Sequence, residues 1–207
     1  MLIRLINCIS YLCRRLFSRA LRYWGGFKAC GAASFDPGIR IDNPGGMRID
    51  DGVLVLRGSW LYCIPGDDGV SRGDLYIGTD TYIGCYSHIT CARKVHFGPK
   101  CVLANYVHIA DSIHGYEDLN LSVLRQPLKS GAVEIGEGVF IGEHCAIFGD
   151  IRIGRHSVIG ANTVLVNCDV PDYCVVVGSP PRIVRRYDAE TGTWPRCNFP
   201  LLKLKEK

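Results

Sequence analysis

Aliphatic residues recur every six positions through the second half of the chain. The series runs Ile135, Ile141, Ile147, Ile153, Ile159 and Leu165, and four of these six residues are followed directly by glycine. A helix would repeat its apolar positions about every 3.6 residues and a strand every second residue, so a strict period of six predicts a short strand and a turn that repeat. The position four residues after each aliphatic one is mostly small or β-branched. This restriction indicates coils that close tightly around a narrow core.

The same register is weaker upstream and is interrupted once downstream. It begins at Ile49 after a Gly-, Ala- and Pro-rich stretch, 25–38, that we interpret as a linker. Asp67, Asp68 and Gly69 follow Pro-Gly in a segment that predicts a turn extruded from a coil. From Ile109 to Ile135 there are 26 residues, which is not a multiple of six. We therefore expect a loop, 110–133, inserted between coils.

The first 24 residues predict an amphipathic helix, because their apolar residues follow the i, i+3, i+4, i+7 spacing. The longest uncharged run, 5–13, has nine residues, far below the roughly 20 that a membrane-spanning helix needs. Arginines follow this run, which is the reverse of a secretory signal. The helix is expected to cap the β-structure or to pack in an oligomer. Peripheral contact of residues 1–24 with an anionic membrane is the alternative.

Three of the repeats carry a family resemblance. Segments 135–140, 141–146 and 153–158 read Ile-Gly-Glu-Gly-Val-Phe, Ile-Gly-Glu-His-Cys-Ala and Ile-Gly-Arg-His-Ser-Val. They resemble the hexapeptide repeats of left-handed parallel β-helix acyltransferases. The resemblance implies an all-β solenoid in which three hexapeptides make one triangular coil, so that six or seven coils fit, and it implies a homotrimer. The expected parts are a helix (1–24), a β-helix acyltransferase domain (36–181) and a short C-terminal helix with a tail (182–207).

The inserted loop carries the best chemical candidate. Its sequence from residue 111 to 118, Asp-Ser-Ile-His-Gly-Tyr-Glu-Asp, resembles the active-site segment of the O-acetyltransferases of bacterial surface polysaccharides and of the maltose and galactoside acetyltransferases. The match covers about residues 75–187 and places His114 at the catalytic histidine. Imidazole, with an ordinary pKa near 6.5, suits removal of a proton from a sugar hydroxyl at neutral pH. His114 is therefore the expected general base, acting by direct transfer in a ternary complex.

The resemblance also implies binding residues. Gly160 and Ala161 match the turn that receives the pantetheine arm of coenzyme A, and Gly142 one coil earlier is expected to add a backbone N–H donor for the oxyanion. Arg182 and Arg185 match the basic residues near the adenosine phosphates. One departure is Val166-Asn167-Cys168, where the family often has Thr-Lys. The candidate acceptor-binding residues are Asp111, Tyr116, Glu117 and Phe140. Packing alone would also explain Phe140 and the small residues Gly142, Gly160 and Ala161.

Composition narrows the alternatives. The net charge is only +4 and the basic residues concentrate at the two ends, which does not favour a nucleic-acid-binding surface. The 11 cysteines are scattered without a C-x-x-C pair, so we expect free thiols of a cytoplasmic protein. The other histidines are expected at the surface. A zinc site like that of the γ-class carbonic anhydrases, which share the repeat, is the chemical rival, but His108 and His114 do not have that family's five-residue spacing.

We thus expect an acetyl-CoA-dependent O-acetyltransferase without a metal, acting on a sugar hydroxyl in surface polysaccharide or lipopolysaccharide biosynthesis. The expected location is the cytoplasm. An N-acetyltransferase for an amino or nucleotide sugar, an enzyme that modifies xenobiotics and a non-catalytic β-helix scaffold remain alternatives. After residue 187 the repeat ends, and Trp194, Phe199, Leu201 and Leu202 predict a tail that packs, with Lys203, Lys205 and Lys207 in solvent.

Overall fold

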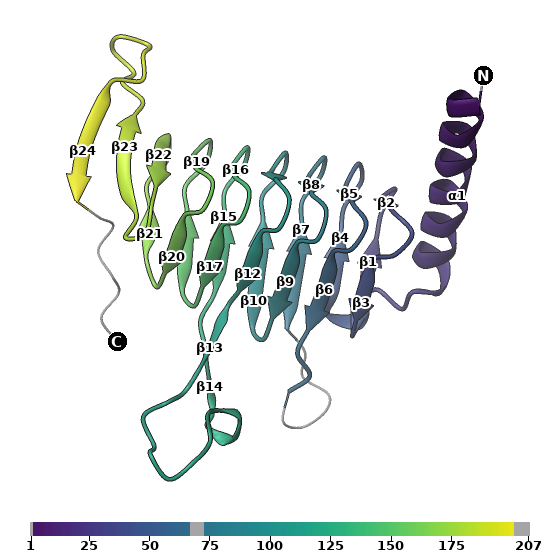
Figure 1. Cartoon of the computed structure of the whole chain (residues 1–207), viewed down its shortest axis with the longest axis horizontal. Helices are drawn as coiled ribbons and strands as arrows, with labels where there is room; N and C mark the ends of the chain where they lie inside the picture. The colour runs from purple at the N-terminus through teal and green to yellow at the C-terminus, as the bar shows by residue number, and fades with distance from the viewer. Residues whose placement is uncertain (1, 67–72, 201–207) are drawn as a thin grey trace.

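The chain winds into coils whose strands stack into three parallel sheets, which form the sides of a long prism (Figure 1). The structure is a computed structural model and describes residues 2–66 and 73–200. Residues 67–69 of the predicted turn and residues 201–207 of the predicted tail lie outside the described ranges. The strands of sheet A are β1 (Ala29–Cys30), β4 (Met47–Ile49), β7 (Asp74–Ile77), β10 (Lys94–Phe97), β15 (Val133–Ile135), β18 (Ile151–Ile153) and β21 (Asp169–Val170).

Sheets B and C complete each coil. Sheet B contains β2 (Ser34–Phe35), β5 (Leu54–Val55), β8 (Tyr82–Ile83), β11 (Val102–Leu103), β16 (Phe140–Ile141), β19 (Val158–Ile159) and β22 (Cys174–Val177), followed by β23 (Arg182–Arg186) and β24 (Arg196–Pro200). Sheet C contains β3 (Arg40–Asp42), β6 (Trp60–Cys63), β9 (His88–Cys91), β12 (His108–Ala110), β17 (Ala146–Phe148) and β20 (Val164–Val166). The order A, B, C along the chain gives seven sheet-A strands in the described part, as the predicted six or seven coils require.

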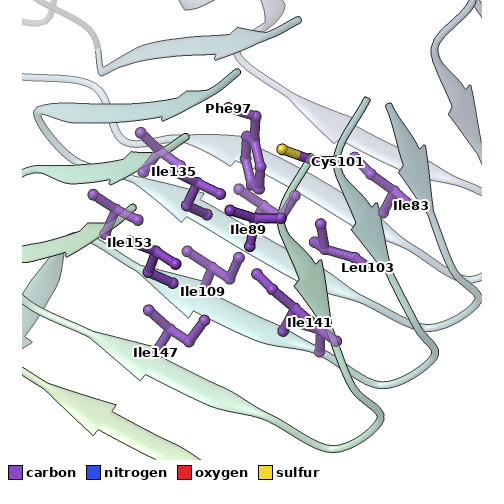
Figure 2. Close-up of a cluster of buried hydrophobic side chains, with 14 of the residues drawn as sticks. Ile83, Ile89, Phe97, Cys101, Leu103, Ile109, Ile135, Ile141, Ile147 and Ile153 are labelled. Atoms are coloured by element: carbon purple, nitrogen blue, oxygen red, sulfur yellow. The ribbon is translucent and has the colours of Figure 1, made fainter. Parts of the chain in front are cut away.

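The residues spaced six apart are the ones that face inward. Ile141, Ile147 and Ile159 are fully buried, and Ile135, the most accessible of the series, is only 4% exposed. Figure 2 shows the side chains of Ile135, Ile141, Ile147 and Ile153 directed into the space between the sheets. The register of strand pairing repeats the spacing in space, because Leu103 aligns with Ile141, which aligns with Ile159. Hydrophobic burial at every sixth residue therefore sets the period of the fold.

The N-terminal helix α1 (Leu2–Trp24) covers the open end of the prism, as predicted for a cap. Phe17 and Leu21 pack against the core, and the Ser18 hydroxyl accepts the backbone N–H of Phe35 at 2.8 Å. The predicted linker 25–38 is partly wrong, since it already contains β1 and β2 and the solenoid begins before residue 36. The six-residue spacing did not predict the first coil, because the 3₁₀ turn Pro44–Gly46 lengthens the connection between this coil and the next. Within the described ranges, no helix has the length and hydrophobicity to cross a bilayer.

The C-terminal segment is not the predicted helix. Residues 182–186 form β23, which runs antiparallel to β22 and then pairs with β24. The last coil leaves the edge of β22 without a following coil, and the chain folds back to pair with it, which protects an exposed strand edge. Ile183 and Val184 also favour a strand. The predicted packing of the tail is seen for Trp194, which is half-buried, whereas Phe199 is exposed.

Candidate active site

The predicted inserted loop is a hairpin that leaves the prism at the corner between sheets C and A. Strand β13 (Ser112–His114) follows β12 almost directly and pairs antiparallel with β14 (Leu128–Ser130), with a 3₁₀ turn, Val123–Arg125, near the tip. In Figure 1 this hairpin hangs below the prism. His114 lies opposite Leu128 at the outer end of β13, and its side chain is exposed. The candidate base is thus carried on a short rigid ladder and is accessible to a substrate.

Asp111 has a different place from the one expected of an acceptor-binding residue. Its side chain is fully buried at the base of the hairpin. One carboxylate oxygen accepts the backbone N–H of Ala92 at 2.7 Å, and the other accepts those of Arg93 and Lys94 at 2.7 and 2.6 Å. Burial raises the pKa of Asp111, although these donors act in the opposite direction. We assign Asp111 to holding the hairpin on the preceding coil.

Tyr116 and Glu117 lie beyond His114 on the same hairpin, and both are exposed. Glu117 forms an ion pair with Lys129, whose ammonium also lies 5.6 Å from the centre of the Tyr116 ring. The hydrogen bond from Lys129 lowers the pKa of the Glu117 carboxyl. Sequence reasoning missed Lys129, which reaches Glu117 only because β13 and β14 pair. These three side chains therefore form one cluster on the hairpin that carries His114.

The backbone N–H of Gly142 is not available for an oxyanion. It donates to the carbonyl of Ile159 at 2.7 Å, and Gly160 donates in the same way to Val176 at 2.8 Å. A Cβ on Gly142 would lie 2.6 Å from the backbone nitrogen of Ala161, so close coil packing alone requires glycine there. The N–H of exposed Ala161 donates to no acceptor within residues 2–66 and 73–200. Exposed Ala161 therefore offers an open donor at this corner between sheets B and C.

The basic residues of β23 differ in their freedom to bind phosphate. Arg182 is exposed on the strand. Arg185 is half-buried and donates to the carbonyl of Trp194 at 2.7 Å, which occupies part of its guanidinium. Asn167, where the family often has lysine, accepts the backbone N–H of Asp150 at 2.9 Å. Arg182 is therefore the better placed of the two predicted phosphate ligands.

Phe140 lies on the outer face of sheet B and is 41% exposed. Its neighbours across the strands are Val102 and Val158. Sheet B forms the side of the prism opposite the corner that carries the hairpin, and its strands lie along the upper edge in Figure 1. One chain therefore brings His114, Tyr116 and Glu117 together but keeps them apart from Phe140 and from the Ala161 corner.

Two other histidines stack on the outer face of sheet C. The rings of Trp60 and His88 lie 4.3 Å apart, and those of His88 and His108 lie 4.7 Å apart. Burial, followed by the nearby His108 and Arg40, lowers the pKa of His88 to about 4. Among the described residues, no group of three or more His, Cys, Asp and Glu side chains is arranged to hold a metal ion. The ten cysteines whose side chains the structure describes are free thiols, as expected.

Comparisons with known proteins identify the fold and the family of the chain. No family model matches the chain. In fold, the chain is similar to AntD of Bacillus cereus, an N-acyltransferase solved with dTDP and 3-hydroxybutyryl-CoA, with a TM-score of 0.67 and 20% identity over 80% of this chain and 86% of AntD. It is also similar to the hexapeptide-repeat acetyltransferase VCA0836 of Vibrio cholerae, solved with acetyl-CoA, with a TM-score of 0.55 and 22% identity over 84% and 78% of the two chains. These likenesses concern the fold, the predicted left-handed parallel β-helix.

Sequence relatives decide the family. WbbJ of Escherichia coli K12, named as a lipopolysaccharide biosynthesis O-acetyl transferase, is 30% identical over 137 residues, which cover 63% of this chain and 69% of WbbJ. The chain belongs to the hexapeptide-repeat acetyltransferases. Rv3034c of Mycobacterium tuberculosis, named as an acetyltransferase, is 28% identical over 131 residues. The aligned residues cover 62% of the present chain but only 43% of Rv3034c. The predicted family and enzyme class are thus confirmed.

Proposed function

We propose that this acetyltransferase moves an acetyl group from acetyl-CoA to a sugar hydroxyl in surface polysaccharide or lipopolysaccharide biosynthesis. One observation carries the proposal: in this member of the acetyltransferase family, the side chain of His114 is exposed on an anchored hairpin. The name of WbbJ supports the acceptor class, and the acetyl-CoA bound to VCA0836 supports the donor.

The proposed reaction uses His114 as the base. Its imidazole takes the proton of the acceptor hydroxyl while the hydroxyl oxygen attacks the thioester carbonyl carbon. A carbon–oxygen bond forms, the tetrahedral oxyanion collapses, and the carbon–sulfur bond breaks. The imidazolium then returns the proton to the thiolate of coenzyme A, so that the histidine is restored without an acyl-enzyme. Tyr116, Glu117 and Lys129 would bind acceptor hydroxyls beside the base.

The donor would lie along the corner between sheets B and C. There the open N–H of Ala161 suits a carbonyl of the pantetheine arm, and Arg182 suits a phosphate through paired hydrogen bonds. Gly142 and Gly160 would contribute room for the ligand rather than hydrogen bonds, because their N–H groups already serve the coils.

A homotrimer would complete the site. The outer row of sheet B is apolar across the middle of the prism, with Tyr82, Val102, Phe140 and Val158 in register. Such a stripe is suited to contact with another protein surface. We propose that the hairpin of one chain, with His114, meets the Phe140 face and the Ala161 corner of the next. This arrangement would unite the groups that one chain holds apart.

The proposal includes the place of the reaction. We propose that the enzyme works in the cytoplasm, at the membrane surface that presents lipid-linked saccharides, with residues 1–24 in contact with that membrane. The basic, amphipathic α1 supports such a contact.

The test is release of free coenzyme A from acetyl-CoA by wild type and by His114→Ala, with sugars, amino sugars, nucleotide sugars and lipid-linked saccharides as acceptors. We expect acceptor-dependent release that falls by about 10² to 10⁴ in the variant. His156→Ala is the matched control, because His156 is exposed and stacks on Tyr173 at another corner of the prism. Equal rates for wild type and His114→Ala would refute the base. Transfer to amino sugars alone would replace the O-acetyl proposal by N-acetyl transfer.

A further inference from the structure

Helix α1 has two different faces, and only one of them is used by the fold. Its inner face carries Arg14, Ser18 and Leu21, which contact the first coil: the Arg14 guanidinium lies 2.5 Å from Asp36, and the Ser18 hydroxyl bonds to Phe35. The opposite face carries apolar side chains that contact nothing comparable. Their exposed fractions are 55% for Leu12, 61% for Leu16, 75% for Tyr23 and 87% for Trp24.

The outer face of α1 contains a cavity of about 390 Å³. The cavity is lined by Leu16, Arg19, Ala20, Tyr23 and Trp24. The aromatic residues lie together at the C-terminal end of the helix. Tyr and Trp are the side chains that prefer a boundary where one end is apolar and the other is wet. Capping of the prism therefore explains the inner face of α1 and leaves the outer face without a role.

The charge of this end of the molecule is strongly one-sided. Residues 1–35 contain six basic residues and no acidic one, so that the remaining 172 residues carry a net charge of −2 within the total of +4. Between α1 and the first coils lies a second cavity, of about 530 Å³. Its lining is rich in arginine and serine and consists of Arg14, Arg15, Ser18, Arg22, Ser34, Gly52 and Leu54. Arg22 uses one N–H for the carbonyl of Ala33 at 2.8 Å, and a guanidinium has five N–H donors.

We propose that the outer face of α1 and the adjoining arginine-lined cavity form a docking site for an anionic lipid bilayer. Leu12, Leu16, Tyr23 and Trp24 enter the boundary between headgroups and acyl chains, and the cavity receives a headgroup phosphate. The geometry suits a helix that lies in the plane of the interface, with its basic flank at the depth of the phosphates. A second copy of the chain fits less well, since it would bring two arginine-rich surfaces of like charge together.

This inference deepens the membrane contact proposed above, and it is independent of acetyl transfer. The docking face lies at the end of the prism covered by α1, away from the hairpin that carries His114 (Figure 1). Lipid binding and turnover of acetyl-CoA can therefore fail separately.

The test is flotation of the full-length protein with vesicles of phosphatidylcholine, with and without phosphatidylglycerol. We expect binding only to the anionic vesicles, and a loss of roughly thirtyfold in affinity for Arg15→Gln/Arg19→Gln, because each basic residue near such a surface contributes about fivefold. Leu16→Ser/Trp24→Ser should also abolish binding. Arg57→Gln is the control, since Arg57 is also exposed but lies on a coil and not on α1. Release of coenzyme A with a water-soluble acceptor should stay at the wild-type rate in all these variants.

Three results would overturn the proposal. The first is equal binding to neutral and anionic vesicles, and the second is unchanged binding by the arginine variant. The third is dissociation of the oligomer by Leu16→Ser/Trp24→Ser, measured by light scattering, because this would make the face a contact between subunits. Failure of acetyl transfer with intact lipid binding would instead count only against the proposed function.

Discussion

Gly131 donates its backbone N–H to the carbonyl oxygen of Asp111 at 2.6 Å, so the hairpin that carries His114 closes on itself where it leaves the prism. The carboxylate of the same Asp111 is held by the previous coil. The hairpin is thus an excursion whose two ends are fixed, and the coils continue in register on either side of it. A chemical group on it can be placed rigidly without disturbing the core.

Replacement of Asp111 should destabilise the protein although it lies outside the hydrophobic core. Asp111→Ala removes the acceptor of three backbone N–H groups, and a buried unsatisfied donor costs about 1–3 kcal/mol. We expect a loss of at least this size in urea unfolding, with faster hydrogen exchange in residues 112–130. Glu117→Ala is the control, because its solvent-exposed pair with Lys129 contributes little to the free energy of unfolding. Similar losses for the two variants would contradict the anchoring role.

The two glycines of the predicted donor corner should respond differently to alanine. In Gly142→Ala the new Cβ meets the backbone of Ala161 at 2.6 Å, whereas in Gly160→Ala it meets a methyl of Val177 at 2.7 Å. The Val177 side chain is 36% exposed and can turn away. We expect Gly142→Ala to cost about 1–3 kcal/mol in denaturant unfolding and Gly160→Ala clearly less. The reverse order would show that the packing argument for Gly142 is wrong.

Stability should fall with acid over a window set by His88. Its pKa is about 4 in the folded protein and near 6.5 in the unfolded chain, so the unfolded state binds the proton first as the pH falls. The melting temperature should therefore decrease from about pH 6.5 to about pH 4. Burial also lowers the pKa of His108, which acts in the same direction. Asp74, whose pKa is lowered from 3.8, contributes only below this window.

His88→Phe tests that assignment. Phenylalanine can keep the stack on Trp60 but carries no proton. We expect the variant to lose less of its melting temperature between pH 6.5 and pH 4 than wild type loses. A pH profile identical to that of wild type would exclude His88 as the source.

Much of the fold follows from the sequence because one physical constraint repeats. Each coil must bury one aliphatic residue per side, so the spacing of Ile135, Ile141 and Ile147 predicts the period of the fold. The break in this spacing after Ile109 predicts the hairpin. The motif around His114 likewise gave the candidate base. Local pattern suffices wherever the structure is itself local and periodic.

Interactions between distant segments could not be predicted. Asp111 reads as an acceptor ligand in its motif, but its partners are backbone groups 17 to 19 residues earlier in the chain. The backbone N–H of Gly142 donates to a carbonyl of the next coil, and this bond follows only from the register of β16 with β19. Residues 182–186 became a strand because the last coil offered an unpaired edge. In each case the deciding partner is set by stacking of coils and not by neighbouring residues.

The most direct test of the shared site mixes two inactive variants. His114→Ala lacks the base, and in Ala161→Trp the new side chain fills the donor corner. The two variants are refolded together in equal amounts, and the rate of release of coenzyme A is measured. If each site takes His114 from one chain and the Ala161 corner from the next, random trimers should regain roughly a quarter of the wild-type rate. No recovery in mixtures that contain hybrid trimers would place both groups of a working site in one chain and contradict the account.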